Sequence, residues 1–240
     1  MKWDFRQLAI RRYNRVRCEA SVEFSFGRSR SFTSDGVPCW RPTFSQSKNR
    51  LSDFSCSTFS PTGSQDDLAA QFGGENVIAA PILGGGAEGE YNEGTVLFAN
   101  DSDSRVEIFW KDRAAKRRPE WIRLQGQQSR WRSPVGLALG TDLRTVERIN
   151  GRPFHLSGLG FDGAGAVLSW EGGKLESLNG SECQLKIWLR PSGDGSNHQM
   201  TVARQRLANQ VAKDGNYSSG HPAMQALNPQ VYQMMLLYRR

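Results

Sequence analysis

Residues 183–190 have the sequence CQLKIWLR, and this stretch gives the clearest structural signal in the chain. Apolar side chains occupy every second position, namely Cys183, Leu185, Ile187 and Leu189. A period of two residues is typical of a β-strand with one buried face. Shifting the register by one residue would bury Lys186 and Arg190, so we expect the facing of this strand to be strongly determined. Cys183 is accordingly predicted to be a small core side chain.

Helices and further strands are predicted on both sides of this strand. One short helix begins at Ser64, which forms a box-like capping pair with Asp67, and Gly73 follows its end. A second helix has Thr141 as its N-cap candidate and is ended by Gly151. Additional strands are predicted over residues 75–79, 95–98, 105–110, 121–124, 154–156, 167–170 and 231–238.

The predicted fold class is α+β, with short helices on one or more antiparallel sheets. Both helices are followed by a glycine and then by strands, as expected for two duplicated helix–strand–strand units over residues 66–128 and 136–240. A chance similarity between two such beginnings is the alternative. On either interpretation, residues 66–240 are predicted to form a single α+β domain.

Residues 1–65 differ in composition from the rest of the chain. They contain twelve Ser, nine Arg and seven Phe with no clear period, and they hold Cys18, Cys39 and Cys56. Three interpretations are open: a disordered basic tail, an upstream extension that is not native coding sequence, and an arm that binds RNA. Cys183 is the one cysteine of residues 66–240, so no disulfide is expected within that segment.

Positive charge is concentrated in the same N-terminal segment. Residues 1–65 carry 11 Lys and Arg against 5 Asp and Glu, whereas residues 66–240 carry 20 against 19. A nearly neutral domain lacks the electrostatic footprint of a nucleic-acid-binding protein, so nucleic acid is not an expected partner of residues 66–240. No stretch is long and apolar enough to predict a membrane span, and no apolar region of a signal peptide is visible near the start.

Candidate site residues occur close to tryptophans. Asp162 and Glu171 are loop carboxylates that could act as a pair in glycoside hydrolysis beside Trp170. Trp188 falls on the polar face of its strand, where it could mark a binding surface or pack beneath a second layer, and the second interpretation is favoured. The histidines and cysteines match no catalytic or metal-binding pattern, so no catalytic residue, metal or cofactor is predicted.

Several motifs in order resemble a family of uncharacterised bacterial proteins that are usually exported. The motifs are GTVLF at residues 94–98, NGRPF at 150–154, GLGFD at 158–162 and SWEGG at 169–173. The resemblance covers about residues 66–238 and implies a periplasmic or extracellular location, but it implies no known activity. Such proteins would carry a signal peptide where this chain has residues 1–65, and none is visible there.

The leading hypothesis is a non-enzymatic envelope or secreted module that binds another protein or a component of the cell envelope. Its candidate binding residues are Asp162, Trp170, Glu171 and Trp188. One alternative is a hydrolase that uses Asp162 and Glu171, and convergence of these carboxylates in a deep pocket would favour it. The other alternative is nucleic-acid binding through the basic residues 1–65.

Overall fold

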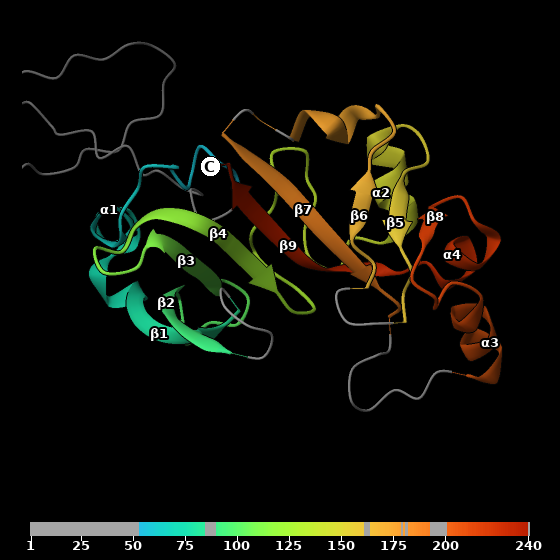
Figure 1. Cartoon of the computed structure of the whole chain (residues 1–240), viewed down its shortest axis with the longest axis horizontal. Coiled ribbons are helices and arrows are strands. Elements are labelled where there is room, and N and C mark those ends of the chain that lie inside the picture. The colour runs from blue at the N-terminus through green and yellow to red at the C-terminus, as the bar shows by residue number, and fades with distance from the viewer. Residues whose placement is uncertain are drawn as a thin grey trace, which may run out of the picture. The chain divides into compact units, whose positions relative to one another are not determined.

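An antiparallel six-stranded sheet lies at the centre of the computed structural model, which describes residues 53–239 except 85–89, 161–163, 179, 181 and 193–200. Its strand order is β1-β2-β3-β4-β9-β7. The strands are β1 (Val77–Leu83), β2 (Tyr91–Leu97), β3 (Val106–Asp112), β4 (Arg117–Gln125), β7 (Cys183–Arg190) and β9 (Gln230–Tyr238). Figure 1 shows the red strand β9 between the green β4 and the orange β7. The most C-terminal strand therefore lies inside the sheet.

A three-stranded sheet of order β6-β5-β8 and several short helices complete the fold. The short strands are β5 (His155–Ser157), β6 (Val167–Ser169) and β8 (Asn216–Ser218). The α-helices are α1 (Gln65–Phe72), α2 (Leu143–Asn150), α3 (Val202–Gln210) and α4 (Pro222–Leu227), and the 3-10 helices are η2 (Gly74–Asn76) and η3 (Lys174–Leu178). The predicted α+β class is confirmed. No helix in the part of the chain that the structure describes is long and apolar enough to cross a membrane.

The alternation along β7 is confirmed, because its four apolar side chains are buried and the intervening ones are half-buried. Ile187 and Leu185 point into the main core, whereas Lys186 and Trp188 point to the opposite face of the sheet. The facing of this strand thus follows directly from the period of two residues.

Side-chain caps fix the start of both predicted helices, α1 and α2. Ser64 and Asp67 form the predicted capping box: the Asp67 N–H donates to Ser64 Oγ at 3.2 Å, and the Ser64 N–H donates to Asp67 Oδ2 at 2.9 Å. The N-cap of α2 is Asp142 instead of Thr141, because the Asp142 carboxylate accepts the Thr145 N–H at 3.0 Å. Burial acts to raise the pKa of Asp142, but the hydrogen bonds from Thr145 outweigh it and hold this pKa below its usual value.

One face of the six-stranded sheet is covered and forms the main core. Side chains of α1, α2 and the irregular segments around Phe59 and Trp131 pack on this face. Ile108, Trp110, Ile122, Ile187 and Met234 are the central sheet residues in this layer. The opposite face carries a smaller cluster of buried apolar residues, formed by Ile82, Val96, Phe109 and Trp121. We call this opposite side the open face of the sheet.

The folded part of the chain includes residues N-terminal to Asp66, which corrects the expected boundary. Phe54 and Phe59 are fully buried, and the Phe59 ring lies 5.5 Å from the ring of Trp131. The Phe59 carbonyl accepts the hydroxyl of Tyr238 at 2.6 Å, and burial raises the pKa of this tyrosine. At least residues 53–65 therefore belong to the folded part, because their phenylalanines fill the core.

A disulfide bond joins Cys56 to Cys183, with the Cα atoms 6.2 Å apart. The alternation along residues 183–190 predicted Cys183 as a core side chain and did not predict this bond. Cys183 is buried as predicted, but its partner lies in the segment that we had assigned to the N-terminal extension. The bond attaches that segment to the first residue of β7.

The two predicted units share a common arrangement in the structure. Ser64, the N-cap of α1, forms an isolated bridge with Arg117, the first residue of β4. Asp142, the N-cap of α2, forms the same kind of bridge with Gln230, the first residue of β9. Each unit thus attaches the start of its helix to the start of its last strand, and β4 and β9 then pair with each other.

The pair β3–β4 of the first unit and the pair β7–β9 of the second unit each contain one register shift. The register shifts between Phe109 and Trp110 in β3, and between Trp188 and Leu189 in β7. Aligning the two pairs at this shift matches Glu107 with Lys186. Their cross-strand partners are then matched as well: Arg123 opposite Glu107, and Met235 opposite Lys186.

We expect loss of the disulfide to destabilise the chain. Replacing Cys56 and Cys183 together by Ser should lower the free energy of unfolding by about 2–5 kcal/mol, because the bond closes a long loop in the unfolded chain. Urea unfolding of the oxidised protein and the double variant measures this difference. Reductant should lower the midpoint of the parent and leave the variant unchanged; equal midpoints for oxidised and reduced parent would contradict the expectation.

Emptying the buried face of β7 is expected to be costly. Ile187→Ala should lower the free energy of unfolding by about 2–5 kcal/mol, since a fully buried aliphatic side chain is removed from a packed site. Chemical denaturation measures the change. A cost below that of a typical surface substitution would be incompatible with the core position of Ile187.

Candidate functional site

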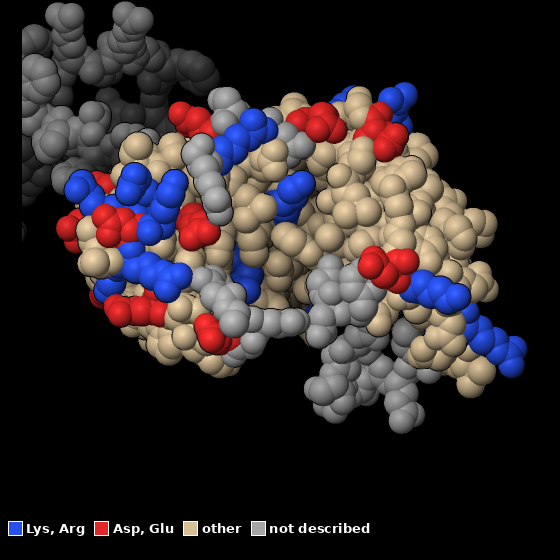
Figure 2. All heavy atoms as spheres, viewed as in Figure 1, with Lys and Arg blue, Asp and Glu red and all other residues tan. Residues whose placement is uncertain are grey.

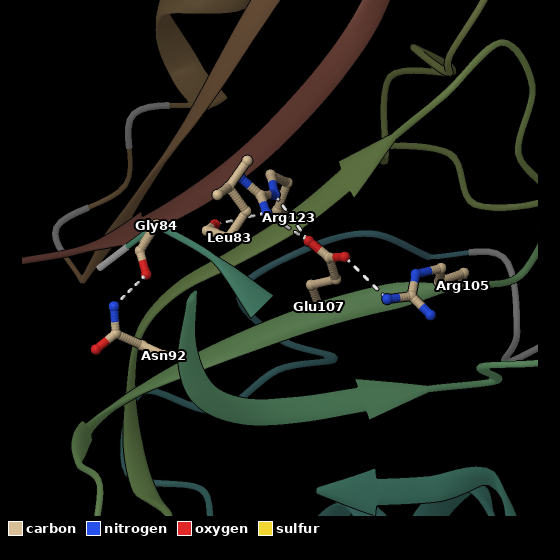
Figure 3. Close-up of polar contacts among 6 residues, drawn as sticks. All are labelled: Leu83, Gly84, Asn92, Arg105, Glu107 and Arg123. Carbon is tan, nitrogen blue, oxygen red and sulfur yellow. Dashed lines mark hydrogen bonds and ion pairs between the residues drawn. The ribbon is translucent and has the colours of Figure 1, made fainter. Parts of the chain in front are cut away.

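In the first unit, the open face of the sheet is occupied by its own side chains. Arg123 donates from Nε and Nη2 to the Glu107 carboxylate at 2.9 and 2.6 Å, and from Nη2 to the Leu83 carbonyl at 2.8 Å. Arg105 donates to the other Glu107 oxygen at 3.0 Å. Figure 3 shows this network joining β1, β3 and β4. Charge in this half is therefore matched internally.

The end of strand β1 also folds over this half of the face. Ile82 is 1% exposed, and a Cβ on Gly94 would overlap the Ile82 side chain, so only glycine allows this approach. Beneath it, Phe109 and Trp121 stack at 5.3 Å with an interplanar angle of 12°. Ring stacking and the overlying hairpin leave little of this half for a partner.

In the second unit, the corresponding half of the face is uncovered. We define the open half-face as the side chains of Leu168, Lys186, Trp188, Arg190 and Gln233. Leu168 is 51% exposed, and the other members that lie on β7 and β9 are half-buried. In Figure 2, drawn from the same side as Figure 1, the surface is hollowed over β4, β9 and β7, and Lys and Arg side chains lie in the hollow. The uncovered half is thus both concave and cationic.

Polar groups of the open half-face have few partners within the chain. Lys186 makes no ion pair or hydrogen bond to any residue that the structure describes, and the same holds for the Trp188 indole N–H. The Arg190 guanidinium lies over the ring of Tyr232, 4.9 Å from its centroid. Because Met235 stands opposite Lys186 where Arg123 stands opposite Glu107, the second unit lacks the internal charge pair of the first.

A small crevice lies beside the open half-face, between β6 and β7. An isolated bridge joins Ala166, just before β6, to Trp188 of β7, and next to it the Leu189 N–H donates to the Gly165 carbonyl at 2.9 Å. Farther along, the strand edges diverge and enclose a cavity of about 110 Å³. Its lining consists of Val167, Leu168, Ser169, Trp170, Glu176, Leu185, Lys186 and Ile187. Lys186 and Leu168 therefore belong to both the crevice and the open half-face.

A larger cavity of about 280 Å³ lies on the helix-covered side, between α1, the segment around Ser60, and strands β3 and β4. Its polar lining includes Ser64 and Asp67, which are already bonded to each other in the capping box. None of its lining residues is cationic.

The structure places the predicted site residues in different settings. Trp170 is buried, lies 5.3 Å from the Phe154 ring and lines the crevice. Glu171 is exposed, and its carboxylate accepts the Ser169 hydroxyl at 2.7 Å. Trp188 is half-buried, so it matches neither a fully exposed position nor one beneath a complete second layer. Asp162 lies outside the described residues, and its relation to Glu171 is therefore not shown.

Sequence patterns located part of this site but missed Leu168 and Gln233. The period of β7 placed Lys186 and Arg190 on the same face as Trp188, as observed. Leu168 was missed because β6 has only three residues, too few to show a period. No group of three His, Cys, Asp or Glu among the described residues is placed to hold a metal ion.

The matched positions Glu107 and Lys186 should respond differently to truncation. Glu107→Ala should cost about 1–3 kcal/mol, because it leaves the Arg123 guanidinium, whose side chain is 12% exposed, without its carboxylate. Lys186→Ala should change stability by no more than about 0.5 kcal/mol, since no contact of its charge is lost. Denaturant unfolding of the two variants tests this, and equal losses would show that Lys186 has a structural role.

Comparison with protein-family models, with curated proteins and with solved structures finds no match to this chain. The resemblance to exported bacterial proteins therefore stays a prediction, and it enters the proposed function only as such.

Proposed function

We propose that this chain is a non-enzymatic envelope or secreted binding module that recognises another protein through the open half-face. The observation that carries this proposal is the grouping, beside a crevice, of an exposed Leu168, a half-buried Trp188 and Lys186, which has no ion pair or hydrogen bond with the described residues. Binding hot spots are enriched in Trp and Arg and lie where partner side chains can be fully desolvated.

The contrast between the two units supports the same surface. The first unit covers its half of the sheet with β1 and neutralises Arg123 with Glu107, so that half is stable without a partner. The second unit leaves an apolar and cationic surface uncovered at the corresponding positions. Apolar surface next to polar side chains at one location is typical of protein-interaction sites.

The Cys56–Cys183 bond supports the envelope or secreted location within this proposal. Structural disulfides persist in oxidising compartments such as the periplasm or the cell exterior and are rare in the cytosol. The bond is buried at Cys183 and connects the folded segments, as expected for a structural disulfide. The resemblance to exported proteins points to the same compartment.

Site-specific photo-cross-linking tests the proposed surface. A photoreactive phenylalanine analogue is placed at Leu168 or, as a matched control, at Val202, an apolar residue of α3 that is 72% exposed. In extracts of the cells that make this protein, we expect adducts to one protein from position 168 and none from position 202. Excess unlabelled chain should compete for these adducts, and Trp188→Ala should reduce their yield by about tenfold.

Two results of this experiment would contradict the proposal. Adducts of equal yield from both positions, or adducts that Trp188→Ala leaves unchanged, would show that the open half-face is not the binding surface.

A further inference from the structure

We infer that the free edge of β1 pairs with the same edge of a second copy of this chain, so that two six-stranded sheets join into one. Strand β1 pairs with β2 alone and lies at the margin of the sheet (Figure 1). This edge belongs to the first unit and is separate from the open half-face of the second. The inference therefore goes beyond the proposed function and does not depend on it.

The backbone groups of β1 point alternately toward β2 and toward the free edge. Just after β1, the Gly84 N–H donates to the Glu90 carbonyl at 2.9 Å. Just before it, the Asn76 carbonyl accepts the Phe98 N–H at 2.8 Å. The register between these two bonds has no shift, so the even-numbered residues of β1 form the hydrogen-bonded pairs with β2. The N–H and C=O groups of the odd-numbered residues therefore point to the free edge.

Most of these outward groups have no partner among the described residues. One exception is the Val77 N–H, which bonds within the preceding 3-10 helix η2. The other is the Leu83 carbonyl, which accepts the guanidinium of the network in Figure 3. Pro81 has no N–H to donate. Within the described part of the chain, unused donors remain on Ala79 and Leu83, and unused acceptors remain on Val77, Ala79 and Pro81.

The side chains of β1 do little to protect this edge. Its sequence, VIAAPIL, contains no charged residue, and Pro81 interrupts the row of donors at one position. Ile78 and Leu83 are 43% and 44% exposed. Ala79 is exposed as well. Edge strands are usually protected by charges, and an uncharged apolar edge is a template for pairing with another chain.

The order of donors and acceptors favours a second copy as the partner. When two copies of β1 run antiparallel about a two-fold axis at Ala80, the Ala79 N–H of one faces the Pro81 carbonyl of the other. In the same register, the Leu83 N–H faces the Val77 carbonyl of the other copy. Every unused donor then meets an unused acceptor. An unrelated peptide would instead bring an N–H opposite the Leu83 carbonyl, which already accepts a guanidinium N–H.

Sedimentation equilibrium of the full chain with its disulfide intact tests this inference. We expect a reversible dimer, and Ala79→Pro should weaken dimerisation by at least about tenfold, because it removes one hydrogen-bond donor from each copy. The Ala79 N–H points away from β2, so this change spares the ladder between β1 and β2. Ala79→Val keeps the N–H and is the matched control, and its dimerisation should be nearly unchanged.

Cysteine cross-linking tests the register without removing a donor. Cys18 and Cys39 are first replaced by Ser, which leaves the added thiol as the one cysteine outside the structural disulfide. Ala80→Cys then places two thiols opposite each other across the two-fold axis, with the Cα atoms about 4.5 Å apart, a separation that a disulfide can bridge. Oxidation should convert most of this variant into a linked dimer. Ala79→Cys is the matched control, because its side chain lies on the other face and opposite a proline, and it should give little dimer.

The contrary results are distinct from failure of the proposed function. A chain that is monomeric at all concentrations tested would overturn the inference. A dimer that Ala79→Pro does not weaken, or that Trp188→Ala abolishes, would form through another surface and would overturn it as well. Equal cross-linking from positions 79 and 80 would exclude the register. None of these results changes what the photo-cross-linking from Leu168 shows about the open half-face.

Discussion

The antiparallel pairing of β4 with β9 is the contact on which the rest of this fold depends. It joins the last strand of the first unit to the last strand of the second, from Trp121 opposite Leu237 to Gln125 opposite Gln233. Through this pairing the two units share one sheet and one core, and neither unit has to bury its strand edge separately. The side chains of Ile122, Leu124, Met234 and Leu236 lie together beneath the joint. The paired residues are more than a hundred positions apart in the sequence, so forming this contact closes a long loop and costs substantial chain entropy.

Local patterns predicted the elements whose residues carry their own periodicity or caps. The strand 183–190 was found because its alternation is complete, and the start of α1 was found because Ser64 and Asp67 form a capping box. Gly151 was correctly placed after α2, where it adopts a left-handed φ of 80°. The short strands β5, β6 and β8 hold three residues each, so their existence depends on neighbours instead of on sequence period.

The N-terminal boundary and the site itself were less predictable for a different physical reason. Composition changes near Asp66, but Phe59 packs against Phe72 and against Trp131, which is distant in sequence, and Phe54 packs against Phe59. The disulfide partner of Cys183 was missed as a direct result. In the site, alternation placed Lys186 beside Trp188, yet it could not show that one half of the face is covered by β1 and the other is open. Coverage is a long-range property, and it distinguishes a structural tryptophan such as Trp121 from a candidate contact such as Trp188.

The interior position of β9 has a consequence for the order in which this protein can fold. During synthesis, residues 230–238 emerge after every other strand of the sheet, yet they pair with β4 on one side and β7 on the other. Until then, β4 and β7 each have an unpaired edge, and the apolar residues that β9 covers stay in contact with water. Folding is thus expected to be slow and to finish only after residues 230–238 have emerged, as is usual for sheets dominated by distant pairings. The Cys56–Cys183 bond joins two segments that must likewise wait for β7 before they can be linked.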